Sequence, residues 1–173
     1  DTVTEKLVYQ YYNSRKNPLL VSAAFWVRIE AFSDYQVYFG DFSNQGPRDG
    51  WFFTYISPTF RFCAEDLGGG AATITPPSLD DWHFVAGSYN GNKASDNVNV
   101  WVDGIRGTPN NYTTDLDYND NFTDMLFGES GPLSTSDKQY QLANCMVFEG
   151  HELTQADVQM LYQGSSNIFK NQA

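Results

Sequence analysis

The sequence predicts an all-β protein: an antiparallel β-sandwich with one short C-terminal helix. The strongest indication is a hairpin within residues 79–107, where apolar and polar side chains alternate on both sides of a polar turn that begins at Asn90-Gly91. Several other segments alternate with the same period of two, which is the period of a strand. Because a hairpin buries one face only against a second sheet, these strands together predict a sandwich.

The other strands follow from the same alternation. Residues 19–31 show it most clearly, since Phe25 and Val27 share one face while Trp26 and Arg28 share the other. Further strands are expected at residues 7–12, 35–42, 51–57, 59–64, 124–130 and 139–148, with short ones within 65–77 and at 105–107. The segment 108–124 is polar and acidic without a strand pattern, which predicts a surface loop.

A helix is expected after the last long strand. Thr154 is a good N-cap, Asp157 stands three residues later, and Gly164 is placed to end the helix after roughly three turns. Val158 would pack on the sandwich. We expect the residues that follow, up to Phe169, to add an edge strand.

Length and charge exclude several classes of function. A chain of 173 residues is long enough for one sandwich, and we expect a single domain over residues 1–173. With 10 Lys and Arg against 21 Asp and Glu, the formal charge is -11, which repels phosphate backbones and argues against a nucleic-acid partner. No run approaches 18 apolar residues, so membrane insertion is not expected. The oligomeric state stays open.

The two cysteines leave their redox state open. Cys63 and Cys145 lie on expected strands far apart in the sequence. They could pair across the sandwich, as in many extracellular domains, but isolated cysteines on apolar strands are at least as often free and buried. The free state is favoured, and the disulfide remains an alternative.

The acidic loop offers a possible calcium site. Asp115, Asp117 and Asn119 have the alternate spacing that begins an EF-hand loop. The motif then fails, because Asp120 replaces the glycine of the sharp turn and Leu126 replaces the bidentate glutamate. A solvated loop is the favoured interpretation, and an irregular Ca²⁺ site with oxygen ligands is the alternative.

Four pieces of the chain together resemble a known family. They are SAAFWVRI at 22–29, DDWHFVAGSYNG and VNVWVDGIRG within 80–107, LFGES at 126–130, and CMVFEGHELTQADVQMLY at 145–162. In order and spacing they are similar to a laminin-G-like, concanavalin A-type jelly roll of the pentraxin kind. The resemblance implies an extracellular or particle-surface binding module, commonly for carbohydrate and often Ca²⁺-dependent. It constrains the fold more than the function, because function varies within a fold.

The resemblance extends to two metal-ligating positions. Asp34 falls where pentraxins place an early Ca²⁺ carboxylate, and Glu129 falls near their acidic metal loop. Gly131 and Pro132 follow where the family supplies further oxygen ligands, so the expected coordination is incomplete. Calcium is therefore a possible cofactor with a partial ligand set.

Glycanases share this jelly roll, so catalysis must be weighed against binding. The retaining glucanases of the fold carry Glu-x-Asp-x-(x)-Glu, which places two carboxylates about 5 Å apart. No glutamate of this chain has an aspartate two positions later. His83 and His151 have no evident aspartate partner, which argues against a Ser-His-Asp triad. These absences favour a protein that is not an enzyme.

A glycan site needs an aromatic ring beside carboxylates and amides. Trp51 and Tyr55 are the candidate rings, because they alternate on one strand next to a glycine-rich loop. The candidate polar groups on neighbouring loops are Asp49, Glu65, Asp66 and Asn92. The alternative for Trp51 is that it belongs to the sandwich core, since large aromatic side chains bury strongly.

The sequence therefore predicts a non-catalytic, lectin-like module, with Ca²⁺ as a candidate cofactor, that binds a glycan or glycoprotein outside the cell or on a particle. An alternative is a structural or attachment domain of a virion, fibre or adhesin that binds protein. A glycan-cleaving enzyme of the same fold ranks third.

Overall fold

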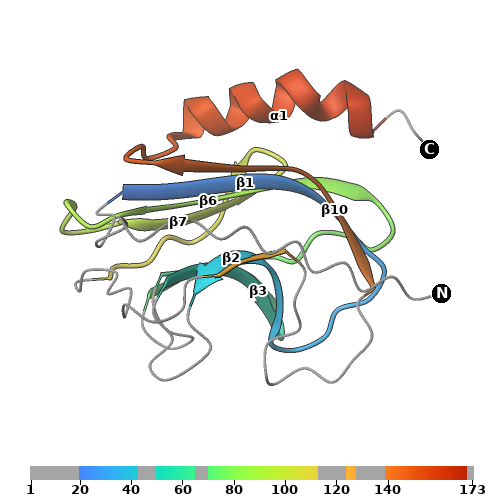
Figure 1. Cartoon of the computed structure of the whole chain (residues 1–173), viewed down its shortest axis with the longest axis horizontal. Helices are drawn as coiled ribbons and strands as arrows, with labels where there is room; N and C mark the ends of the chain where they lie inside the picture. The colour runs from blue at the N-terminus through green and yellow to red at the C-terminus, as the bar shows by residue number, and fades with distance from the viewer. Residues whose placement is uncertain (1–19, 43–49, 65–69, 113–123, 128–138, 171–173) are drawn as a thin grey trace.

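The computed structural model describes residues 20–42, 50–64, 70–112, 124–127 and 139–170. Over these residues the chain forms two antiparallel sheets that face each other, and one helix lies across the outer side of one sheet (Figure 1). This arrangement confirms the predicted all-β sandwich with a C-terminal helix. The expected strand at residues 7–12 lies outside the described residues.

The sheet under the helix has the strand order β10-β1-β6-β7-β8. Its strands are β1 (Leu20–Ile29), β6 (Trp82–Asn90), β7 (Val98–Val102), β8 (Ile105–Arg106) and β10 (Tyr140–Glu149). Strands β6 and β7 form the expected hairpin. At the turn into β8, Asp103 and Gly104 have φ of 51° and 79°, a left-handed conformation that aspartate and glycine tolerate better than most residues.

The second sheet has the strand order β5-β4-β3-β2-β9. Its strands are β2 (Gln36–Phe42), β3 (Gly50–Ile56), β4 (Thr59–Ala64), β5 (Gly70–Ile74) and β9 (Asp124–Phe127). All five correspond to expected strands: the ends of β2 and β3 lie within one residue of the predicted ones, β5 lies within its predicted segment, and β9 is described over Asp124–Phe127. Strand β4 has the predicted bounds because Pro58 separates it from β3.

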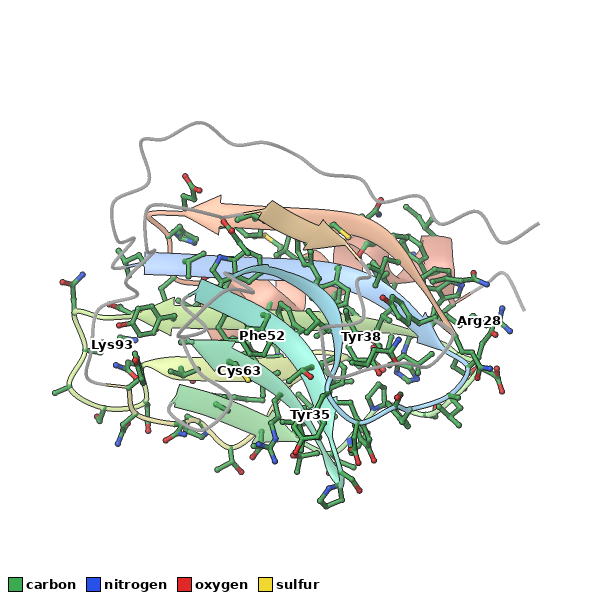
Figure 2. The ribbon with its side chains drawn as sticks, turned by 60° about the horizontal axis from the view of Figure 1, so that its bottom comes forward. Arg28, Tyr35, Tyr38, Phe52, Cys63 and Lys93 are labelled. Atoms are coloured by element: carbon green, nitrogen blue, oxygen red, sulfur yellow. The ribbon has the colours of Figure 1, made fainter. Side chains whose placement is uncertain are left out.

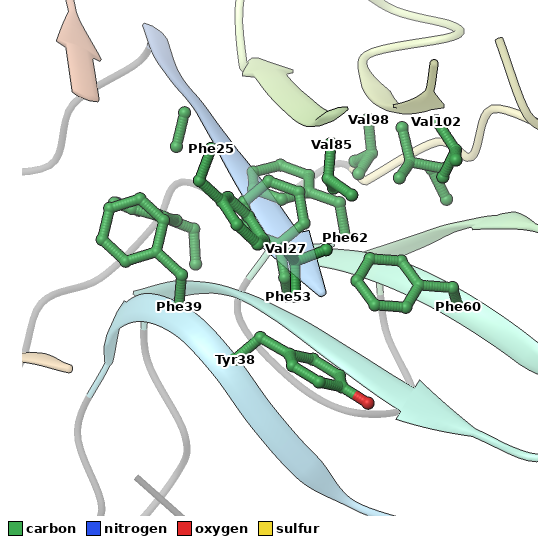
Figure 3. Packing of buried hydrophobic residues seen from close by; sticks show 14 of the residues in the cluster. Phe25, Val27, Tyr38, Phe39, Phe53, Phe60, Phe62, Val85, Val98 and Val102 are labelled. Carbon is green, nitrogen blue, oxygen red and sulfur yellow. The ribbon is translucent and has the colours of Figure 1, made fainter. Parts of the chain in front are cut away.

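Aromatic side chains fill the space between the two sheets (Figure 3). Phe25 of β1 meets Phe39 and Phe53 edge to face, with ring centroids 5.5 Å and 4.8 Å apart. Such contacts add to the burial of apolar area, which is the main stabilising contribution of a core. Gly87 of β6 permits the close approach of the sheets, because a Cβ at that position would overlap the ring of Phe62.

A second apolar cluster lies between the sheet and the helix α1 (Gln155–Phe169). Trp26 and Phe84 project from the sheet into this cluster, where Val158 of α1 is fully buried. The face of β1 opposite Phe25 is therefore covered by the helix, whereas its alternation with Arg28 had suggested a half-exposed strand. The sheet is buried on both sides along much of its length.

The start of α1 agrees with the prediction and its end does not. Thr154 is the N-cap and forms a capping box with Asp157. The predicted stop at Gly164 is wrong, because the helix continues to Phe169, and the expected edge strand is wrong for the same reason. Contacts beyond the glycine hold the extra turn, since Trp26 Nε1 donates to Ser165 Oγ at 3.0 Å and its ring stacks on Phe169.

The two cysteines, both in the described part of the chain, are not joined by a disulfide. Cys63 packs with Val37 and Phe52 on the outer face of its sheet. Cys145 packs against the core between the sheets, and burial raises the pKa of its thiol to about 12. Their opposite placement accounts for the absence of a bond between them.

Among the described residues, no helix is both long and apolar enough to cross a lipid bilayer.

Candidate functional site

A cavity of about 440 Å³ lies where the end of β1, the start of β6 and the end of α1 meet. Its lining residues are Arg28, Asp80, Asp81, Trp82, His83, Phe169 and Lys170. We call it the C-terminal cavity, because it lies at the C-terminal end of α1. The extra helical turn beyond Gly164 creates one of its walls, since Phe169 is the last residue of that turn and Lys170 is the C-cap that follows it.

Stacked aromatic rings form the apolar part of the C-terminal cavity. Phe169 stacks on the buried ring of Trp26, with centroids 4.7 Å apart and planes 18° apart. The ring of Trp82 also packs near Phe169, with centroids 5.3 Å apart. Because Trp82 is only partly buried and lines the cavity, part of its ring is available to a ligand.

Arg28 supplies hydrogen-bond donors to the same cavity. It pairs with Trp82 across β1 and β6, so both side chains leave the same face of the sheet. Its Nε donates to the carbonyl oxygen of Asp80 at 2.9 Å, which fixes the guanidinium plane. Within the described residues this is the one side-chain hydrogen bond of Arg28, so its terminal nitrogens have no acceptor there.

A chain of hydrogen bonds runs from the cavity wall into the hairpin. His83 Nδ1 lies 2.8 Å from Asp103 Oδ2, and His83 Nε2 lies 2.8 Å from Ser78 Oγ. Ser78 Oγ also donates to Asp81 Oδ2 at 3.2 Å. The amide of Phe84 donates to Asp103 Oδ1 at 3.0 Å, which fixes the carboxylate in place.

The charges around Asp103 favour its ionised form. Burial raises the pKa of the Asp103 carboxyl, but hydrogen bonds from His83 and the Phe84 amide, with the positive charges of His83 and Lys170, outweigh burial and lower it below the usual value. Lys170 Nζ lies 3.4 Å from Asp103 Oδ2 and 2.8 Å from the hydroxyl of Tyr162. Asp103 therefore joins the hairpin to the end of α1.

The expectation that His83 lacks an aspartate partner is wrong. Asp103 stands 20 residues away in the sequence and meets His83 because the hairpin brings them together. The hydrogen bonds that link Ser78 to His83 and His83 to Asp103 resemble those of a Ser-His-Asp catalytic triad. However, Ser78 is exposed and is not among the residues that line the C-terminal cavity, and its Oγ lies within hydrogen-bond distance of both His83 Nε2 and Asp81 Oδ2.

A second cavity, of about 330 Å³, lies at the other end of α1. We call it the N-terminal cavity; it is lined by Lys93, Asp96, Asn99, Trp101, Arg106, Glu152, Leu153, Thr154 and Gln155. Figure 2 shows Arg28 and Lys93 at opposite ends of the molecule, so the two cavities are far apart. The polar groups of the N-terminal cavity bond largely to one another.

The structure changes the interpretation of the predicted glycan residues. Trp51 is fully buried in the core between the sheets, so its ring cannot stack on a sugar, and the core alternative describes it correctly. Tyr55 is partly buried and stacks on Phe32 with centroids 4.5 Å apart. The backbone N–H of Asn92 donates to Asn90 Oδ1 in the hairpin turn. None of these three lines either cavity.

Asp49, Glu65, Asp66, Asp115, Asp117 and Glu129 lie outside the described residues. Asp34 is described, and its Oδ1 accepts a hydrogen bond from the Ser57 amide at 2.7 Å. No group of three or more His, Cys, Asp or Glu side chains in the described ranges could hold a metal ion. The calcium site therefore stays a prediction.

Several solved structures of longer proteins contain a part that has the same fold as this chain. The sialidase of Trypanosoma rangeli in complex with sialic acid superposes with a TM-score of 0.62 at 15% identity, over 88% of this chain and 24% of the sialidase. The botulinum neurotoxin serotype C1 binding domain gives 0.62 at 17% identity, over 84% of this chain and 36% of that one. A structure from work on the ganglioside-dependent cell entry of botulinum neurotoxin type C gives 0.57 at 17% identity, over 84% and 35%.

This chain thus spans between 24% and 36% of the length of these proteins. At such low identity the likeness shows the fold, which an enzyme and a binding domain share here, so the fold does not decide between catalysis and binding. The curated proteins contain no match to the chain. A laminin G-type family model, described as the concanavalin A-like lectin/glucanases superfamily, matches residues 12–159. The chain therefore belongs to the concanavalin A-like lectin/glucanase superfamily.

Proposed function

We propose that the protein is a non-catalytic carbohydrate-recognition module and that the C-terminal cavity binds the sugar. The observation that carries this proposal is the combination of a partly exposed Trp82 ring with donors and acceptors in one cavity. A sugar presents C–H groups on one face and hydroxyls at its rim. Trp82 would stack against that face, Arg28 would donate to the hydroxyl oxygens, and Asp81 would accept from hydroxyl hydrogens.

The comparisons support a glycan as the partner. One structure with the same fold is a sialidase bound to sialic acid, and another concerns a neurotoxin whose cell entry depends on gangliosides. Both ligands are glycans or carry them. We infer that this chain recognises a glycan or glycoprotein surface, which would place it outside the cell or on a particle.

A glycan array followed by calorimetry on the array hits tests the proposal. Trp82→Ala should abolish binding, and Arg28→Gln should weaken it by at least about tenfold, because a hydrogen bond from a charged donor is lost. Arg106→Gln is the matched control, because Arg106 lines the N-terminal cavity. Each variant's melting temperature separates loss of the site from loss of the fold.

Two results would overturn the assignment of the site. If Trp82→Ala and Arg28→Gln bind the array hits as tightly as wild type, the sugar binds elsewhere. If the folded wild type binds no glycan, the alternative of a protein-binding structural or attachment domain takes precedence. Hydrolysis of an array glycan by wild type would instead favour the glycan-cleaving alternative.

The proposed assistance by Ca²⁺ has a separate test. Thermal unfolding in EDTA and in millimolar Ca²⁺ should show a higher melting temperature with the metal if it binds the native state alone. Asp34→Asn and Glu129→Gln should then remove the difference. An unchanged melting temperature would restrict the proposal to metal-independent binding.

A further inference from the structure

The backbone of the loop before β6 holds the Arg28 side chain in place. Arg28 Nε donates to the carbonyl oxygen of Asp80 at 2.9 Å, and the backbone N–H of Asp80 donates in turn to the carbonyl oxygen of Ile29 at 2.8 Å. Ile29 is the next residue of β1, so the acceptor that holds Arg28 is itself fixed to the same strand. The guanidinium therefore has less conformational freedom to lose on binding a ligand than a side chain in open solvent has.

The guanidinium of Arg28 has an edge that no described residue uses. Its two terminal nitrogens present parallel N–H groups along that edge, which matches the two oxygens of a carboxylate. Arg28 takes part in none of the ion pairs within the described residues, although Asp80 and Asp81 line the same cavity. Its cross-strand neighbours, Trp82 and Gln141, carry no charge. The charge of Arg28 thus lacks an acidic partner in the described part of the chain.

The other charged groups of the C-terminal cavity have different surroundings. Lys170 Nζ lies 3.4 Å from Asp103 Oδ2, so its charge is paired within the protein. Asp80 and Asp81 lie on the exposed loop before β6, where water weakens their repulsion of a ligand anion. Arg28 is therefore the cation of this cavity that gains most from an anionic ligand.

We infer that Arg28 makes the C-terminal cavity bind a sugar that carries a carboxylate more tightly than a neutral sugar, an inference that rests on the proposed function. A carboxylate accepts two parallel N–H bonds from one guanidinium, whereas a hydroxyl has a single oxygen, and charge-assisted hydrogen bonds are roughly twice as strong as neutral ones. Arg28 and Trp82 stand opposite each other on neighbouring strands, about 5 Å apart at Cβ, so one sugar residue reaches both. Trp82 would stack on its ring while Asp81 accepts from a hydroxyl.

Calorimetry with matched probe pairs tests this selectivity. One pair is the α-methyl glycoside of N-acetylneuraminic acid and the methyl ester of that glycoside; the other is methyl β-D-glucuronide and methyl β-D-glucoside. The salt concentration is about 0.15 M, where the Debye length is about 8 Å and distant charges are screened. In wild type, the acid of at least one pair should bind roughly tenfold more tightly than its neutral partner. The pair that shows the difference identifies the class of acidic sugar.

Variants then show whether Arg28 causes the preference, measured as the ratio of the two affinities within a pair. Arg28→Gln should remove it, because the amide has neither the charge nor the guanidinium fork. Arg28→Lys keeps the charge without the fork and should restore only part of it. Trp82→Ala should weaken both members of a pair together, since stacking does not involve the carboxylate. Arg106→Gln removes the same charge at the N-terminal cavity and should leave the preference unchanged.

The selectivity and the proposed function fail in distinguishable ways. A preference that survives in folded Arg28→Gln, equal binding of acid and neutral probes by wild type, or a glycan array whose hits are all neutral would overturn the selectivity and leave carbohydrate recognition intact. If no probe binds and the array is also negative, the proposed function fails and the selectivity fails with it. The melting temperature of each variant shows whether it is folded.

Discussion

The two cavities at the ends of helix α1 are lined by similar kinds of side chain, which differ in how far they are hydrogen-bonded to one another. In the N-terminal cavity, Glu152 accepts from Lys93 at 2.5 Å and from Asn90 at 2.6 Å, and Trp101 Nε1 donates to Gln155 at 2.9 Å. In the C-terminal cavity, Arg28 and Trp82 keep donors and ring surface available. The comparison teaches that a polar lining does not by itself make a ligand site, because groups that satisfy one another have little to offer a ligand.

The largest expected effect on stability comes from removing the packing contacts at the C-terminal end of α1. Trp26→Ala removes the fully buried ring under Phe169 and the donor to Ser165, and should cost about 3–5 kcal/mol of unfolding free energy. Urea unfolding measures the loss, and hydrogen exchange should show the last turn of α1 opening while its first turn stays protected. Trp101→Ala is the matched change at the other end. Equal loss of protection at both ends in both variants would mean that α1 docks as one unit.

An intermediate effect should come from the link between the hairpin and α1. Because the pKa of Asp103 is lowered in the fold, its ionised form stabilises the protein above the unfolded value, near pH 4, and this contribution is lost as the pH falls below it. Asp103→Asn should cost about 1–3 kcal/mol at pH 7 and much less at pH 3. Urea unfolding at both pH values checks this, with Asp80→Asn as control. A penalty that is the same at pH 3 would contradict it.

The smallest effect is expected at the helix N-terminus. Thr154→Ala removes the capping box with Asp157 and should lower stability by about 1 kcal/mol. The measurement is the urea midpoint at constant slope, together with faster exchange in the first turn of α1. The C-terminal cavity should keep any glycan affinity, since it lies at the opposite end. A loss of affinity would show that the two ends are coupled through the helix.

The strands were predictable from local pattern, whereas the end of the helix was not. Strand β4 has its predicted bounds because alternation and Pro58 are both local signals. Gly164 is also a local signal, and it was overridden by the packing of Ser165 and Phe169 on Trp26. Helix stop signals are modest in energy, so the burial of an aromatic ring outweighs them.

The candidate site was harder to predict than the fold. Alternation along β3 identified Trp51 as part of one face without showing whether that face was covered, and it is buried. The contact between His83 and Asp103 could have been predicted, because the hairpin register that pairs Val85 with Val102 places Phe84 opposite Asp103. That Arg28 and Lys170 line the same cavity could not be predicted, because it depends on how far α1 runs across the sheet.

The extra turn of α1 also has a consequence for the order in which the site forms during synthesis. The cavity joins Arg28 and Trp82 to Phe169, so its two halves leave the ribosome at widely separated times. Strands β1, β6 and β7 can meet while the last turn of the helix is still untranslated. A ligand for this cavity would therefore bind only after α1 has folded onto the sheet.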